Sequence, residues 1–354
     1  MRNIVSDTNK ELGLVARSIA GLFPGYFALV MATGITSIAT HLLEMAWIAK
    51  PLVYVNMAAF AILWLCLIVR LINFFPRVRT DFTDHGRGPG FFTIVAATCV
   101  LGSQLVIVTG EYRVATWLWF FGIFCWIAIM YGFFTAVTVR EDKPTLQKGI
   151  SGAWLIAAVA TQSVSVLGTL LSQHLENYRE IVLFFTLSMF LVGCMLYLML
   201  ITLIFYRFTF LGITLETLTP PYWINMGAVA ITTLAGARLI LASTEWHFLD
   251  EIKPFLKGFT LFFWASGTWW IPLLFILGFW RHVYKRFPLR YDPQYWGMVF
   301  PLGMYTACTF QLSKALDFPP LMVIPRVSVY LAVIAWAVAF AGLILTLLPR
   351  RANE

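Results

Sequence analysis

The chain has 354 residues, of which 60% are hydrophobic, 16% aromatic and only 12% charged. Soluble globular proteins carry about 25% charged residues, so this composition excludes that class, together with disordered chains and nucleic-acid-binding proteins. The sequence therefore predicts an integral membrane protein, whose formal net charge of +8 must be divided between the two sides of a bilayer.

Charge-free intervals mark the predicted membrane spans, because a charged side chain is costly at the centre of a bilayer. Ten intervals have at least 19 residues, which is enough for a helix to cross the hydrocarbon. They are residues 18–43, 51–69, 88–110, 114–139, 149–175, 181–206, 217–237, 258–280, 293–313 and 327–349. They lack the alternation typical of a transmembrane β-barrel, so we predict an all-α integral membrane protein with ten transmembrane helices.

The distribution of basic residues predicts the orientation of these helices. The N-terminus, the C-terminus and the even-numbered connections together hold 17 of the 25 Lys and Arg residues. Because cytoplasmic loops are enriched in Lys and Arg, we expect both termini to be cytoplasmic in a multi-pass protein of the bacterial inner membrane. The predicted division is a cytoplasmic segment at 1–17, a single transmembrane pore domain at 18–349 and a cytoplasmic tail at 350–354.

Motifs for catalysis, metals and cofactors are missing from the sequence. The five cysteines all fall within predicted spans and form no CxxC pair, and the five histidines lie at span ends or in connections. No phosphate-binding loop, zinc-protease motif or nucleophile elbow occurs. We therefore expect no enzyme activity, no cofactor and no metal.

Small and weakly polar residues alternate between the predicted helices. Gly, Ala, Ser, Thr, Asn and Gln make up 57 of 118 residues in the odd-numbered intervals but only 31 of 117 in the even-numbered ones. Small residues allow helices to approach closely, whereas bulky apolar residues suit lipid. This alternation predicts five helical hairpins around a central pore, with odd helices inside and even helices outside. A tightly packed bundle without a pore would use the same small residues and stays open as an alternative.

Three segments carry a resemblance to a known family. They are residues 23–27 (FPGYF) with 31–34 (MATG), the connection from 75–77 (FPR) to 90–92 (GFF), and residues 296–301 (WGMVFP). Together and in this order they resemble the tellurite-resistance and dicarboxylate transporter family, which includes the slow-type anion channels of plant guard cells. The likeness covers essentially the whole chain in span number, spacing and alternation.

The resemblance implies a homotrimer in the lipid bilayer, in which each protomer encloses its own pore. It also implies that one phenylalanine closes this pore, and the motif maps that role onto Phe300, with Trp296 and Pro301 as its support. An aromatic ring across a narrow pore excludes water and ions, and a rotamer change moves it aside. The alternative is that Phe300, one of 31 phenylalanines, only packs.

The lack of acidic residues in the predicted inner helices favours anions as the transported species. No acidic residue lies within the odd-numbered intervals, which argues against a cation pathway. The candidate pore-lining residues are Thr33, Gly34, Thr98, Ser163 and Thr232. Arg238, near the far end of the seventh interval, is a candidate for attracting anions to the outer mouth, although its side chain could instead reach the lipid interface.

Two functions compete at this point. The first is a channel for small monovalent anions such as chloride or nitrate, gated by Phe300. The second is a carrier or exporter of small dicarboxylates (malate, succinate) or oxo-anions (sulfite, tellurite), with possible proton coupling. A carrier of dianions needs a convergent cationic site near the membrane centre, and Arg238 is off-centre, so the sequence favours the channel.

Overall fold

The computed structural model describes residues 13–347. The predicted tail at 350–354 and the first twelve residues of the predicted N-terminal segment lie outside the described residues. Within the described range, the chain forms helices and turns and contains no strand. All five cysteines are free thiols.

Ten long helices make up most of the described chain. They are α3 (Ala28–Leu42), α4 (Ala46–Asn73), α6 (Phe92–Gln104), α7 (Tyr112–Val139), α9 (Ile156–Leu171), α10 (Arg179–Phe210), α11 (Ile224–Leu241), α13 (Lys253–Phe279), α14 (Trp296–Leu316) and α15 (Val323–Leu347). Four short helices lie in the connections: α2 (Leu14–Ala20), α5 (Phe75–Phe82), α8 (Leu146–Gly149) and α12 (His247–Glu251).

Nine of the long helices in the described range are long and apolar enough to cross a membrane. With the turns that extend them, they run over 19 to 35 residues. The helix α14 is not among the nine, and its last turns carry Gln311, Ser313 and Lys314. The prediction of an all-α protein with many apolar spans is therefore confirmed, whereas a membrane crossing by α14 stays a prediction.

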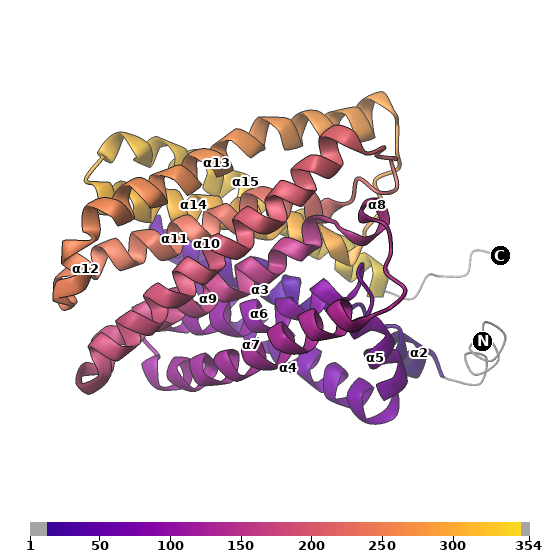
Figure 1. Ribbon diagram of the computed structural model, residues 1–354, viewed down its shortest axis with the longest axis horizontal. Helices are drawn as coiled ribbons and strands as arrows, with labels where there is room; N and C mark the ends of the chain where they lie inside the picture. Colours follow the sequence, from indigo (N-terminus) through magenta and orange to yellow (C-terminus); the bar gives the residue numbers. More distant parts are fainter. Residues whose placement is uncertain (1–12, 348–354) are drawn as a thin grey trace.

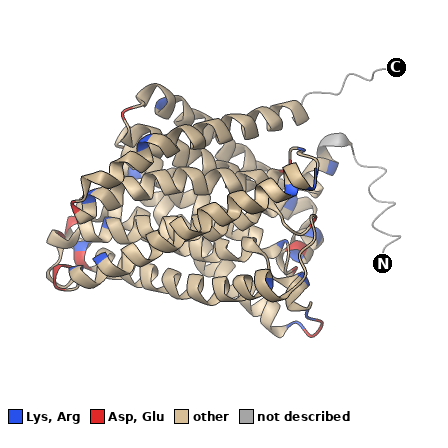
Figure 2. Ribbon diagram, turned by 90° about the horizontal axis from the view of Figure 1, so that it is seen from above, with Lys and Arg blue, Asp and Glu red and all other residues tan. Residues whose placement is uncertain are grey.

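Charged side chains gather at the two ends of the helix bundle. The ribbon seen from above shows Lys, Arg, Asp and Glu at both ends and hardly any along the middle (Figure 2). The short helices α2, α5 and α8 lie at one end, called here the near end, and α12 lies at the opposite, far end (Figure 1). An apolar band between two charged ends is the arrangement that a bilayer demands.

Five helices form a closed inner ring. Each of α3, α6, α9, α11 and α14 packs against the next, and α14 packs back against α3. In the apolar stretches of α3, α6, α9 and α11, between 83% and 94% of the residues are buried, compared with 17–44% in α4, α7, α10, α13 and α15. The helices rich in small residues are thus the buried ones, since small side chains let their backbones approach closely.

Each outer helix lies over a seam of the inner ring. It contacts the inner helix that precedes it in the chain and also the next inner helix around the ring. The last outer helix, α15, follows the same rule, because it contacts both α14 and α3. Five successive pairs of one inner and one outer helix therefore close into a ring.

Indole donors tie the outer helices to the inner ring. Three tryptophans donate a hydrogen bond to a threonine hydroxyl on the next inner helix at 2.8–3.0 Å, in the pairs Trp126–Thr161, Trp264–Thr309 and Trp336–Thr33. A polar atom that faces lipid has no water with which to form a hydrogen bond. An indole N–H that points toward the inner ring instead finds a threonine hydroxyl as its acceptor.

Arginines close the near end of the helix pairs. The outer helices α4, α7 and α10 each end near an arginine that donates to a backbone carbonyl ahead of its own inner helix, in the pairs Arg70–Ala20, Arg140–Thr83 and Arg207–Ile150, at 2.9–3.3 Å. This repeated bond fixes where α3, α6 and α9 begin, and it therefore positions the turns that precede them.

Two tryptophans on α7 test the inner and outer faces. Trp119 is 4% exposed and donates to the carbonyl of Val164, whereas Trp117 is 71% exposed. We expect Trp119→Phe to destabilise the protein by about 1–3 kcal/mol, because it removes the buried indole hydrogen bond to that carbonyl and leaves a cavity behind. Trp117→Phe is the matched control and should leave the midpoint of thermal unfolding in detergent unchanged. Equal midpoints for the two variants would contradict the assigned faces.

Candidate pore and gate

Every inner helix begins with a 3-10 turn, and the five turns form a second ring. They are η1 (Pro24–Phe27), η2 (Gly88–Phe91), η4 (Gly152–Leu155), η7 (Pro220–Trp223) and η10 (Pro293–Tyr295), and each contacts its two neighbours. Three of them follow closely on α2, α5 and α8, which places the ring at the near end (Figure 1). Four carry proline in their first two positions, where its fixed φ favours a helical start and its missing N–H costs nothing.

Two glycines allow the turns to meet. A Cβ atom at Gly90 would lie 2.8 Å from the backbone nitrogen of Gly25, and a Cβ at Gly152 would overlap the carbonyl oxygen of Pro221. Backbone cannot move aside as a side chain can, so a larger residue at either position would force neighbouring turns apart. The near-end opening is therefore held narrow by backbone contact.

A cavity of about 30 Å³ lies inside this ring of turns, and we call it the vestibule. All five inner helices or their turns contribute to its lining. Its rim includes the partly or fully exposed residues Phe23, Gly86 and Gln294, whereas its floor includes the buried residues Met31, Val159 and Phe300. The vestibule therefore opens toward the near end and closes within the bundle.

Phe300 lies at the closed end of the vestibule. It is 1% exposed and sits about one turn into α14, after Trp296. The ring of Pro301 packs against Gly227 of α11, where a Cβ would lie 2.7 Å from its Cγ. Trp296 is fully buried, and its indole donates to the Tyr291 hydroxyl at 3.0 Å. The three motif residues thus have different neighbours, and only Phe300 lines the cavity.

The spacing of the lining residues shows which face of each helix looks toward the vestibule. Ala28 and Met31 on α3, and Ile156 and Val159 on α9, follow helical spacing. Continued along α9, the same face contains Ser163. This keeps Ser163 among the candidate pore-lining residues.

Other residues predicted to line the pore point elsewhere. The Thr33 hydroxyl accepts its bond from Trp336 on the outer helix α15. A Cβ at Gly34 would lie 2.7 Å from Val100 and 2.9 Å from Asn56, so this glycine serves the contact of α3 with α6 and α4. Neither residue lines the vestibule.

The predicted lining hydroxyls are already used within their own helices. Thr98 donates to the carbonyl of Ile94, Ser163 to that of Ala160 and Thr232 to that of Ala228, at 2.7–2.8 Å. Such bonds within a helix occupy the hydroxyl proton. These hydroxyls would have to break an existing bond before they solvated an anion.

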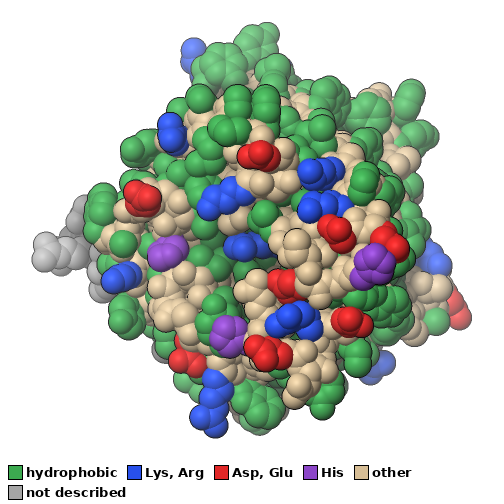
Figure 3. Space-filling view, turned by 90° about the vertical axis from the view of Figure 1, so that its left-hand side faces the viewer, with side chains coloured by type: hydrophobic (Ala, Val, Ile, Leu, Met, Phe, Trp, Pro, Cys, Tyr) green, Lys and Arg blue, Asp and Glu red, His purple; other side chains and the backbone are tan. Residues whose placement is uncertain are grey.

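Arg238 lies in the last turn of α11, toward the far end. It is partly exposed, and its Nε is buried with no hydrogen-bond partner among the described residues. The far-end face carries several Lys and Arg side chains near its centre, with Asp, Glu and His residues among them (Figure 3). Position and charge are thus compatible with the predicted role of Arg238 at the outer mouth.

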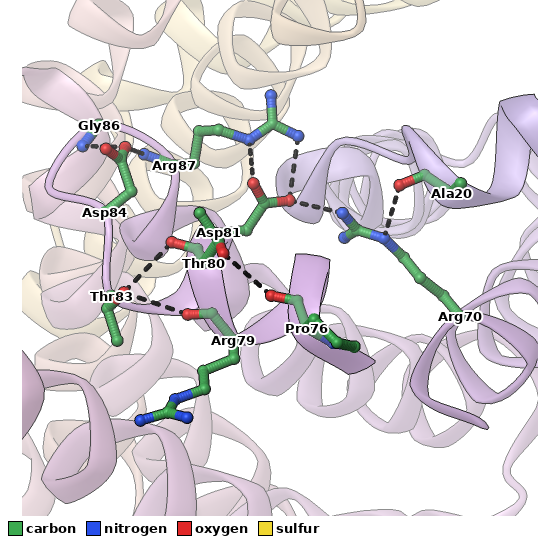
Figure 4. A network of polar contacts seen from close by, with 10 residues as sticks. All are labelled: Ala20, Arg70, Pro76, Arg79, Thr80, Asp81, Thr83, Asp84, Gly86 and Arg87. Carbon is green, nitrogen blue, oxygen red and sulfur yellow. Dashed lines mark hydrogen bonds and ion pairs between the residues drawn. The ribbon is translucent and has the colours of Figure 1, made fainter. Parts of the chain in front are cut away.

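An ion-pair network supports the rim of the vestibule. The Asp81 carboxylate accepts from Arg70 at 2.6 Å and from Arg87 at 2.7 and 3.1 Å (Figure 4). The Arg70 side chain is 2% exposed and that of Asp81 13%. The sequence alone predicts no role for Asp81, Arg87 or Phe23, although Asp81 and Arg87 lie within the connection from 75 to 92 that carries the family resemblance and Phe23 begins another such segment.

His85, beside the rim residue Gly86, adds no charge there at neutral pH. Its burial, followed by the positive charge of Arg140, lowers the pKa of the imidazole from its ordinary value of 6.5. The imidazole is therefore mainly neutral at pH 7. The charges near this part of the rim belong instead to arginine, lysine and aspartate side chains, among them Arg140, Lys143 and Asp84.

The Asp81 network provides a stability test. Asp81→Asn removes the charge that compensates the buried Arg70, and an unpaired buried charge costs about 3–5 kcal/mol. We expect a clear drop in the thermal midpoint in detergent. The exposed Asp142 lies in the connection between α7 and α8. It provides the control Asp142→Asn, which should unfold as the wild type does. If the two variants behaved alike, the network would have no structural role.

Comparison with known proteins places the chain among transport proteins. It is 25% identical to an uncharacterized transporter of Methanocaldococcus jannaschii over 85% of this chain and 86% of that one. It is 23% identical to a sulfite efflux pump of Trichophyton rubrum, over 92% and 90% of the two chains, and 22% identical to a malic acid transport protein of Schizosaccharomyces pombe, over 82% and 70%.

One further relative matches a shorter stretch of the chain, and one family matches most of it. An uncharacterized membrane protein of Mycobacterium tuberculosis is 38% identical over 128 residues, and the chain spans 64% of that relative's length. The family described as voltage-dependent anion channel, SLAC1, matches residues 22–344. The matched residues include both ends of the inner ring and the vestibule, and the chain belongs to the SLAC1 family of membrane transport proteins.

Proposed function

We propose that the chain is an anion channel whose pore runs through the inner ring of each protomer and is closed by Phe300. One observation carries the proposal: five inner helices surround a vestibule that is open toward the near end and ends at the Phe300 ring. In this proposal, all ten long helices cross the bilayer as five hairpins, α14 included, and chloride or nitrate is conducted.

The charges of the inner ring support anions over cations. The helices α3, α6, α9, α11 and α14 contain no Asp or Glu. Their Lys and Arg residues are Arg238 and Lys314, both in the last turn of a helix at the far end. A pore with cations at its mouth and no acidic side chain inside concentrates anions without trapping them.

The surroundings of Phe300 suit a gate. Its ring shares the vestibule lining with Met31, Val159 and Ile224, so an apolar constriction excludes water and hydrated ions. Residues that only pack have neighbours on every side, whereas one side of this ring borders the vestibule.

The proposal also includes the orientation of the protein in the membrane and its assembly into an oligomer. The near end is the cytoplasmic side of the bacterial inner membrane, because it carries most of the basic residues in the predicted connections. Three protomers assemble into a homotrimer through their apolar outer helices, as the family resemblance implies. Arg238 attracts anions at the far end, and Ser163 lines the pore beyond the gate.

Carrier activity is the second candidate, and the names of two relatives favour it. They are called a sulfite efflux pump and a malic acid transport protein. A carrier for such anions needs several cations that converge on one bound molecule near the membrane centre. In the inner ring, Arg238 and Lys314 both lie at the far end, which supports the channel over the carrier.

Flux through liposomes separates the two functions. For a channel, we expect anion currents from the purified protein that reverse at the Nernst potential of chloride or nitrate and do not depend on a proton gradient. Protein-free liposomes provide the control. Saturating uptake of sulfite or malate that requires a proton gradient would refute the channel.

Substitution of Phe300 tests the gate. Truncating a buried phenylalanine in a packed core costs about 3–5 kcal/mol, but a ring that borders a cavity leaves a space that water can fill. We expect Phe300→Ala to keep most of its thermal stability and to raise anion current several-fold or more, with Phe300→Leu intermediate. Trp296→Ala is the matched control, because it removes a fully buried indole and should destabilise without opening the pore. Folded Phe300→Ala protein with wild-type current would refute the gate.

A further inference from the structure

We propose that Phe23 is a second barrier of the same pathway, at the rim of the vestibule, and that Arg87 positions its ring. The inference rests on the proposed function, since a barrier at the rim matters for transport only if the vestibule conducts. It adds a site that neither the family match nor the gate motif assigns.

Two aromatic side chains line the vestibule, one at each end. Phe300 lies at the buried floor, and the half-buried Phe23 lies at the rim. Several of the other lining residues are small, namely Gly25, Ala28, Gly86, Gly90, Ala153 and Gly297. The two rings are the aromatic groups that an anion meets on its way from the near end.

The Phe23 ring is held against the first turn of the inner ring. A Cβ at Gly25 would lie 2.9 Å from the Cζ of Phe23 and closer still to its Cε1. The ring therefore rests directly on the backbone of η1, which lines the same cavity. Glycine at position 25 is what allows the ring to lie this close.

Arg87 lies over the same ring. Its guanidinium lies 5.6 Å from the centroid of the Phe23 ring, within the range of a cation–π interaction. Two hydrogen bonds from Arg87 to Asp81 fix that guanidinium, and Asp81 is itself anchored by the buried Arg70 (Figure 4). A chain of contacts thus runs from the core to the rim ring.

Two barriers in series have distinct effects on flux. While Phe300 closes the pore, removal of Phe23 changes the current little, because the tighter barrier limits transport. Once Phe300 is truncated, the rim becomes the narrowest point, and Phe23 sets the rate. The vestibule between the two rings is shielded by Phe23 whether or not the gate is open.

Cysteine labelling tests the rim barrier directly. Ala28 lines the vestibule between the rings and is 7% exposed. In full-length protein reconstituted in liposomes, an anionic, membrane-impermeant methanethiosulfonate reagent is added from the near end to Ala28→Cys. We expect Phe23→Ala to raise the labelling rate at least tenfold, and Phe23→Leu to give a smaller increase. Protein without the added cysteine gives the background from the five native thiols.

Arg87→Gln tests the positioning role. It keeps hydrogen-bonding capacity but removes the charge over the ring, so labelling of Ala28→Cys should rise about threefold or more, and Arg87→Lys should rise less. As a control for general loosening, Gln311→Cys, labelled from the far end, should react at the wild-type rate in both variants. Acceleration at both positions would mean that Arg87 only stabilises the fold, and would overturn its positioning role.

Flux measurements distinguish the rim barrier at Phe23 from the gate at Phe300. In the Phe300→Ala background, Phe23→Ala should raise anion current at least threefold further, and in the wild-type background less than twofold. Equal labelling of Ala28→Cys with and without the Phe23 ring would overturn the rim barrier. If labelling accelerates but Phe300→Ala carries no current, the rim barrier stands and the gate falls.

Discussion

The close approach of the five inner helices at their near-end turns determines how the other helices and the vestibule are arranged. Glycines such as Gly90 and Gly152 bring backbone against backbone, and larger side chains there would separate the turns. This contact sets the width of the vestibule and places Phe300 across its floor. Bulky side chains are thereby displaced to the outer helices, where lipid accepts them.

The polar groups of the bundle must find hydrogen-bond partners within the protein, because the bilayer offers them no water. Tryptophans of the outer helices donate inward to threonines of the inner ring, as Trp126 does to Thr161. Arginines such as Arg207 reach back to carbonyls ahead of their own inner helix, here that of Ile150. These bonds fix the register between the two rings and leave the vestibule lined mainly by apolar and small residues.

Much of the fold is predictable from the sequence, and less of the site. The division into helices rich and poor in small residues matches the buried and exposed helices, because composition reports the environment of a whole helix. Which residues of a helix line the cavity depends on the rotation of that helix about its axis, and composition does not determine this rotation. Thr33 is polar and central in its helix, yet it serves Trp336. Phe23 and Arg87 are distant in sequence and meet only once the turns close into a ring.

In the proposed channel, one continuous pathway runs through the inner ring and is closed at Phe300. A cysteine at Gln311, on the same face of α14 but beyond the gate, tests it most directly. With an impermeant thiol reagent supplied only from the near end, we expect no labelling of Gln311→Cys in the wild-type background and clear labelling when Phe300 is replaced by alanine. Folded double-variant protein that stays unlabelled from the near end, yet reacts from the far end, would contradict it.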